Sequence, residues 1–185
     1  MTCVCRGACG IEEDDSIVLL GGYSGGRDYL SQVTRYSLQG QQESLPALGQ
    51  ARFGSGCAKY EEAGGVVYLV AGGGAHGQTM ASTEILSPGS GSWKEVASLP
   101  QALAGVMGVT LDNTVLMTGD PDHSPPYNPH GLYTGGLNRQ YDNVTGSVLR
   151  WTGTSWVTAG AMTRPRSSHG VSLVETAGLI SQCQV

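Results

Sequence analysis

Residues 67–73 read Val-Tyr-Leu-Val-Ala-Gly-Gly, a short apolar run that ends in paired glycines. Two other runs have the same form, Ile-Val-Leu-Leu-Gly-Gly at 17–22 and Val-Leu-Met-Thr-Gly-Asp at 115–120. The first glycines of the three runs, at positions 21, 72 and 119, lie 51 and 47 residues apart. This period is too long for helical repeats of about 34 residues and indicates larger repeated units.

The composition agrees with a folded chain that turns often. Glycine supplies 29 of the 185 residues, 39% of the chain is hydrophobic and 14% is charged. The net charge is −5 and no basic patch is present, so we expect no nucleic-acid partner. No apolar run approaches about 18 residues, so we expect no membrane span.

Further landmarks repeat in phase with the glycine runs. A second apolar segment follows each run, and a tryptophan follows it in two units, at Trp93 and Trp156. Short segments of β-branched and aromatic residues between Gly, Pro and Ser predict strands, and tryptophans at this spacing predict packing between sheets. The predicted strands are 17–20, 33–37, 52–58, 66–71, 83–86, 105–111, 114–118, 147–151 and 155–158.

The stretch Thr-Glu-Ile-Leu-Ser-Pro at 83–88, followed by Trp93 and then Leu-Pro, resembles the kelch repeat family. Ser87 stands where the family usually has Asp, and Arg52 matches the arginine that commonly opens a unit. The resemblance covers about residues 8–175. It implies that each unit is one four-stranded blade of a β-propeller.

The expected fold class is therefore all-β, with kelch-type blades of four antiparallel strands in an incomplete or open propeller. Closed propellers have about four to eight blades, and this chain has about three. The chain is thus either a fragment of a longer protein or a protomer that self-associates through its open propeller edges. The predicted units are blade 1 at 1–46, blade 2 at 47–100, blade 3 at 101–162 with a long loop insertion at 120–147, and a partial fourth blade at 163–185.

The insertion in blade 3 has two interpretations. It is either a long loop between the second and third strands, or it contains a duplicated strand at 132–136. We favour the loop, because residues 109–119 already form a hairpin around Asp112-Asn113.

Several motifs match catalytic patterns without their required context. Residues 22–26 fit the G-x-S-x-G nucleophile elbow and residues 72–77 fit a dinucleotide fingerprint, but neither is followed by a convincing helix. Cys3, Cys5 and Cys9 lack a local fourth zinc ligand, so we expect buried, reduced cysteines. We expect no catalytic residues, no metal and no cofactor.

The resemblance implies a non-catalytic module that binds a protein partner through loops on one face, since rigid scaffolds usually carry binding sites on their loops. Tyr and Arg are favoured interface anchors. The loops after the glycine runs supply the candidate partner-binding residues Tyr23, Arg27, His76, His123, Tyr127, His130, Tyr133 and Arg139.

Two other functions remain open. Kelch-like propellers include metal-dependent enzymes, and His123 and His130 offer metal-binding groups in the long loop. A secreted recognition domain is the other alternative, suggested by the glycosylation sequon at Asn143. The first residues lack the features of a signal peptide, so we expect a cytoplasmic location, or a secreted one if such a segment precedes Met1.

Overall fold

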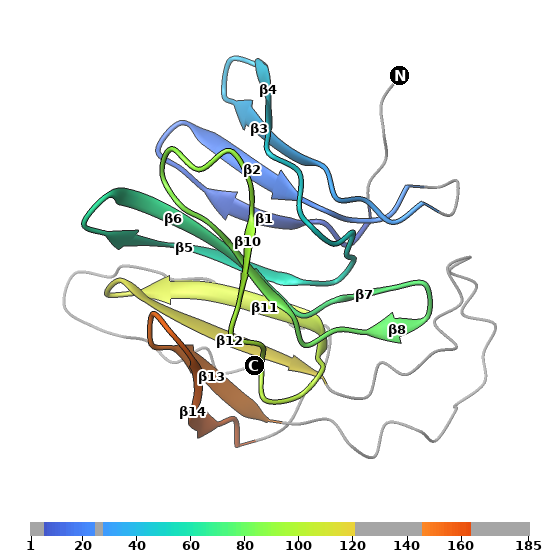
Figure 1. Ribbon diagram of the computed structural model, residues 1–185, viewed down its shortest axis with the longest axis vertical. Coiled ribbons are helices and arrows are strands. Elements are labelled where there is room, and N and C mark those ends of the chain that lie inside the picture. The colour runs from blue at the N-terminus through green and yellow to red at the C-terminus, as the bar shows by residue number, and fades with distance from the viewer. Residues whose placement is uncertain (1–5, 25–27, 121–145, 164–185) are drawn as a thin grey trace.

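The computed structural model describes residues 6–24, 28–120 and 146–163, and these residues form strands and turns without a helix. Three antiparallel four-stranded sheets make up the structure (Figure 1). We call them blades 1, 2 and 3. The fold class predicted from the sequence is confirmed: the protein is all-β, with four-stranded blades in an incomplete propeller.

Each blade is named by its strands in spatial order. Blade 1 contains β1 (Cys9–Glu12), β2 (Ser16–Leu20), β3 (Val33–Ser37) and β4 (Gln42–Leu45). Blade 2 contains β5 (Gly56–Glu62), β6 (Gly65–Ala71), β9 (Thr83–Leu86) and β10 (Lys94–Val96). Blade 3 contains β11 (Ala104–Leu111), β12 (Thr114–Asp120), β13 (Ser147–Trp151) and β14 (Trp156–Ala161).

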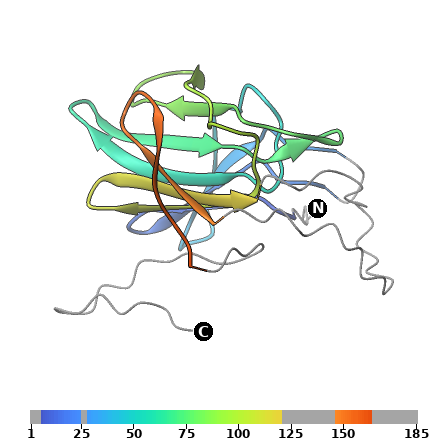
Figure 2. The same cartoon turned by 90° about the horizontal axis from the view of Figure 1, so that it is seen from below.

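The blades stack as layers whose first strands lie together. Strand β5 packs against both β1 and β11, which places the first strands of the three blades side by side. A small hairpin of β7 (Gly74–Ala75) and β8 (Gln78–Thr79) extends beyond the sheets at one end, as both views show (Figures 1 and 2). This end carries the candidate site described below.

The apolar runs become strands that are buried on both faces. In β6, Val67, Leu69 and Val70 are all fully buried, so alternate side chains fill the cores on either side of blade 2. Gly72 then turns the chain with φ +66°, and a Cβ there would lie 2.7 Å from the carbonyl oxygen of Leu103. Only glycine fits this close approach without strain.

Two hydrophobic cores separate the three blades. The first core lies between blades 1 and 2 and includes Trp93, whose Nε1 donates to the carbonyl oxygen of Pro46 at 2.8 Å. The second core lies between blades 2 and 3 and includes Trp156, whose Nε1 donates to Thr83 Oγ1 at 3.0 Å. The predicted packing of tryptophans between blades is confirmed.

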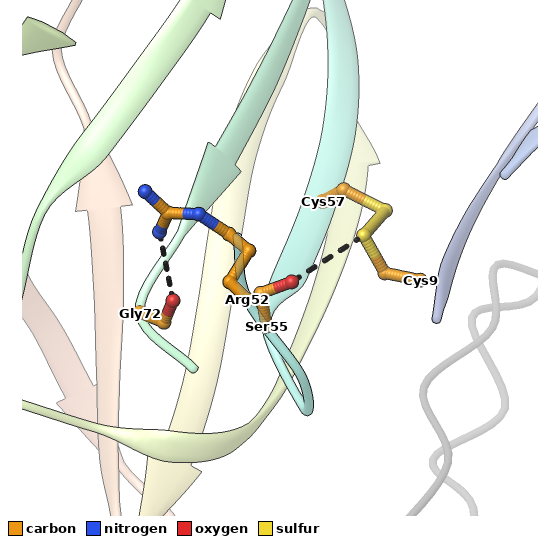
Figure 3. Close-up of a disulfide and its surroundings, with 5 residues drawn as sticks. All are labelled: Cys9, Arg52, Ser55, Cys57 and Gly72. Carbon is orange, nitrogen blue, oxygen red and sulfur yellow. Dashed lines mark hydrogen bonds between the residues drawn. A yellow bond between two sulfur atoms is a disulfide. The ribbon is translucent and has the colours of Figure 1, made fainter. Parts of the chain in front are cut away.

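One cysteine differs from its predicted state. Cys9 was expected to be reduced, but the structure pairs it with Cys57 in a disulfide whose Cα atoms are 5.9 Å apart. The two cysteines are 48 residues apart in sequence and meet because β1 and β5 face each other across the first core. Figure 3 shows the bond, with Ser55 Oγ 3.8 Å from Cys9 Sγ.

Several strand predictions also need correction. The sequence did not predict β1, β4 and β10, which contain few β-branched residues, or the two-residue strands of the small hairpin. Strand β5 begins at Gly56 instead of residue 52, because Arg52 and Phe53 make their backbone hydrogen bonds to the loops of both neighbouring blades. The hairpin around Asp112-Asn113 is confirmed, with φ of 46° and 58° at its two turn residues.

Strand β12 pairs directly with β13, as a loop between the second and third strands of blade 3 requires. The alternative strand at 132–136 lies outside the described residues. The boundaries of the predicted units at 46, 100 and 162 stay predictions, and the partial fourth blade lies outside the described residues beyond 163.

Candidate functional site

The candidate site is formed by two loops that follow the glycine turns of neighbouring blades. The first loop connects β2 to β3 in blade 1, and the second connects β6 to β9 in blade 2 and contains the β7–β8 hairpin. That hairpin turns through His76 and Gly77, with φ of 50° and 79°, which is the type I′ turn favoured by strand twist. His76 is thereby held at the tip of the hairpin.

Arg52 fixes both loops from below, the first through its backbone. Its carbonyl oxygen accepts a hydrogen bond from Gly22 N at 2.8 Å, and its own N–H donates to the carbonyl oxygen of Leu30 at 3.1 Å. Gly22 and Leu30 lie at the two ends of the blade 1 loop. The backbone of Arg52 therefore closes that loop.

The side chain of Arg52 closes the second loop. Nη1 donates to the carbonyl oxygens of Gly72 at 2.8 Å and Ser82 at 3.1 Å, and Nη2 donates to Ser82 Oγ at 3.1 Å. The contact with Gly72 is drawn in Figure 3. One residue thus sets the positions of two loops from different blades.

The charge of Arg52 is neutralised inside the protein. Its Nη2 lies 2.6 Å from Glu84 Oε1, and the two side chains are 0% and 4% exposed. Glu84 also accepts the backbone N–H groups of Gly49 at 2.6 Å and Gln50 at 3.3 Å. Burial of an ion pair is tolerated when further hydrogen bonds satisfy its atoms, so this pair positions loops and does not contact solvent or ligand.

Phe53 extends this linkage to the hairpin. Its N–H donates to the carbonyl oxygen of Gly74 at 3.0 Å, and Gly74 N–H donates back to the carbonyl oxygen of Phe53 at 2.9 Å. Tyr23 makes a similar reciprocal pair with Arg6, at 2.8 and 3.0 Å. The loops are therefore held by backbone ladders and not by side chains alone.

Four rings from these segments form one cluster, which we call the aromatic rim: Tyr23, Tyr29, Phe53 and His76. The ring centroids of Tyr23 lie 5.4 Å from those of Tyr29 and 6.3 Å from those of Phe53, both with edge-on geometry. Tyr29 lies 4.9 Å from His76. Edge-to-face pairs at these distances are favourable, so the two loops form one continuous surface.

The rings differ in their access to solvent. Tyr23 is only 8% exposed, so it supports the cluster from beneath. Tyr29 and Phe53 are half-buried, and His76 is exposed. The surface available to a partner therefore consists of His76 at the tip with the edges of Tyr29 and Phe53 beside it.

The structure brings together two of the residues proposed from the sequence, Tyr23 and His76. The other candidates lie outside the described residues: Arg27, His123, Tyr127, His130, Tyr133 and Arg139. Sequence reasoning missed Tyr29 and Phe53. Tyr29 shares a loop with Tyr23, which was a usable signal, whereas the position of Phe53 depends on a pairing with Gly74 that the sequence does not show.

A second polar cluster lies where the first two blades meet and links them. Arg35 of blade 1 donates to Glu13 Oε2 at 2.8 Å and to Tyr68 Oη of blade 2 at 3.0 Å, and Tyr68 donates to Glu13. Burial raises the pKa of Glu13, but hydrogen bonds from Tyr68, Arg35 and Ser16 outweigh it and leave that pKa below its ordinary value. Every charged group here is paired, so the cluster serves the interface between blades.

Other features offer little chemistry. A groove of about 220 Å³ between β1, β5 and β11 is lined by backbone and uncharged side chains, with the Cys9–Cys57 disulfide among them. Within the described ranges, no three His, Cys, Asp or Glu side chains gather as metal ligands. The same residues contain no helix that is long and apolar enough to cross a membrane.

No family model matches the chain. No curated protein matches it either. Among solved structures, "Structure of YjhT" is similar, with a TM-score of 0.54 and 14% sequence identity. The match covers 65% of this chain and 40% of that chain, so this protein spans well under two thirds of the length of that structure. At this identity the similarity shows the fold alone.

Proposed function

We propose that the protein is a non-catalytic interaction module that binds a protein partner through the aromatic rim. The observation that carries this proposal is the contact between Tyr29 and His76, which joins loops of two blades into one partly exposed surface. Aromatic side chains at the edge of a rigid scaffold are favoured binding anchors because they bury much area and lose little entropy. The in-phase repeats and the blade architecture favour membership of the kelch repeat family, whose propellers mostly bind other proteins.

The arrangement of buried charge supports a binding role over a catalytic one. Arg52 with Glu84, and Arg35 with Glu13, are spent on holding blades and loops together. The groups left at the surface of the rim are one imidazole and the edges of two aromatic rings. Such a surface suits recognition of a protein through apolar and aromatic contacts, with His76 supplying a hydrogen bond.

A site-specific crosslink tests this function. A photoreactive amino acid placed at position 76 should capture a specific protein from an extract of the source cells, whereas the same group at position 38 should not. Leu38 is the matched control because it is 80% exposed in the β3–β4 turn, away from the rim. Capture at position 76 should be competed by the unlabelled protein and lost when Tyr29→Ala is added. Equal capture at both positions would contradict the proposal.

The alternative of a metal-dependent enzyme is distinguished by metal analysis of the purified protein. Stoichiometric copper or iron would favour the enzyme and would direct attention to the histidines of the 120–147 segment. The binding module predicts that no metal is retained in a fixed ratio to protein.

The disulfide favours the secreted recognition domain as the setting for this binding role. Disulfides persist in oxidising compartments and are rare in the cytosol. We therefore propose that the protein works in an oxidising compartment, in place of the cytoplasmic location expected from the first residues. Thiol labelling of the protein in its native extract tests this: Cys9 and Cys57 should resist labelling until a reductant is added.

A further inference from the structure

The interface between blades follows one rule that the two observed interfaces share. In the second strand of each blade, the residues one and three positions before the first glycine face the next blade, and we call this the leading face. The residues two and four positions before that glycine face the previous blade, and we call this the trailing face. In the first interface, Val18 and Leu20 lead from blade 1 against Tyr68 and Val70 of blade 2.

The second interface repeats this arrangement. Leu69 and Ala71 lead from blade 2, and Val115 and Met117 receive them on the trailing face of blade 3. All four side chains are at most 1% exposed. Position in the repeat therefore decides which neighbour a side chain contacts.

Two faces remain without a blade against them, and they are the two complementary halves of this interface. The trailing face of blade 1 carries Ile17, which is 42% exposed, whereas its equivalents Tyr68 and Val115 are 8% and 1% exposed. The leading face of blade 3 carries Leu116, which is half-buried, whereas its equivalents Val18 and Leu69 are fully buried. An apolar side chain at an interface position is thus left accessible at each end of the arc.

Charges beside these two residues are also complementary. In the first interface, Arg35 pairs across the sheet with Val18 and reaches Tyr68 of the next blade. Arg150 stands in the same place in blade 3, because it pairs across the sheet with Leu116, and its side chain is exposed.

The receiving positions complete the comparison. Lys59 pairs across the sheet with Tyr68 in blade 2, and Glu12 is its equivalent in blade 1, where it pairs with Ile17 and is exposed. An interface built by the same rule would therefore bring Arg150 of one blade against Glu12 of the other. Opposite charges at matched positions favour this pairing over a wrong partner.

We propose that these two faces bind each other in a second copy of this chain. Blade 3 of each copy packs on blade 1 of the other, and the two identical contacts close a ring of six blades. Head-to-tail contacts form closed rings when the rotation per subunit closes, and six blades fall within the range of about four to eight found in propellers. This association is separate from the aromatic rim, which lies on loops outside both faces.

Multi-angle light scattering of the full 185-residue chain tests the proposal, with a charge swap as its sharpest arm. The native chain should elute at twice its monomer mass. Glu12→Arg alone, or Arg150→Glu alone, sets like charges against each other and should raise the dimer dissociation constant by about tenfold or more. The double variant E12R/R150E should restore the dimer. Both residues are exposed, so circular dichroism should show an unchanged fold in every variant.

An apolar arm adds a larger effect and a control. Ile17→Asp and Leu116→Asp should each abolish the dimer, and mixing the Ile17→Asp chain with the Arg150→Glu chain should form a heterodimer through the one intact interface. Leu38→Asp, on a turn outside both faces, should leave the dimer unchanged. A monomer at all concentrations, as expected if another segment covers these faces, would overturn the proposal. So would an open polymer, or a dimer in which the single charge variants have no effect.

Discussion

The two interfaces between blades use equivalent positions but different chemistry. Between blades 1 and 2, the core is joined to the Cys9–Cys57 disulfide and to the charged network around Arg35. Between blades 2 and 3, packing is mainly apolar, with the rings of Trp151 and Trp156 5.3 Å apart. The comparison teaches that the repeat conserves which face of a strand is buried, whereas the groups that join the faces are free to vary.

The largest expected effects come from the tryptophan that each interface has in common. Trp93→Ala and Trp156→Ala should each lower the free energy of unfolding by about 3–5 kcal/mol, because each removes a buried ring and a hydrogen bond to the preceding blade. Chemical denaturation followed by circular dichroism measures this loss. Substitutions in 120–147 should change the free energy by no more than about 0.5 kcal/mol. Equal effects in the two regions would contradict the prediction.

The disulfide should distinguish the two interfaces. Reduction of Cys9–Cys57 releases a loop of 48 residues and should lower the free energy of unfolding by about 2–4 kcal/mol. Hydrogen exchange should rise mainly in blade 1 and β5, while the core between blades 2 and 3 stays protected. A Cys9→Ser variant provides the control, since a reductant should have no further effect on its stability. Uniform loss of protection would show that the blades unfold as one unit.

The smallest effect concerns the charged network of the first interface. The pKa of Glu13 lies below its ordinary value of 4.5 in the folded protein, so its contribution to stability is present above pH 4.5 and is lost as the pH falls through the folded pKa. The network is partly exposed, so we expect a contribution of only about 1 kcal/mol. Unfolding midpoints measured from pH 7 downward should fall less steeply in Glu13→Gln than in the native chain. Parallel curves for the two proteins would exclude this role for Glu13.

The sequence predicted the strands that alternate or run apolar, because burial on one or both faces leaves a periodic pattern. The runs that became β2, β6 and β12 were found in this way. It did not predict β4, whose residues Gln42–Leu45 are mostly exposed and polar, because an outer strand needs little apolar surface. Pairing with β3 alone holds this strand in the sheet.

The candidate site was predictable only in part, for a different reason. Glycine turns marked the loops that carry Tyr23 and His76, so these residues could be proposed together. The contribution of Phe53 and the pairing of Cys9 with Cys57 depend on contacts between blades. A repeat pattern gives the content of each blade but not which side chains of two blades meet.

Arg52 illustrates both limits. Its match to an arginine of the repeat was visible in the sequence, yet its backbone serves one blade and its side chain another. Burial beside Glu84 explains why an arginine is required: five donors are needed to reach two carbonyl groups, a hydroxyl and a carboxylate at once. The rim depends on this residue without including it.

The central claim is that loops of two blades form one aromatic surface, and proton NMR measures it directly. Nuclear Overhauser cross-peaks between the ring protons of Tyr29 and His76 should be present in the native chain, since the ring centroids lie 4.9 Å apart. They should disappear in an Arg52→Met variant that retains its β-sheet signal but no longer anchors the Gly72 turn. Absence of these cross-peaks in the folded native chain would contradict the account.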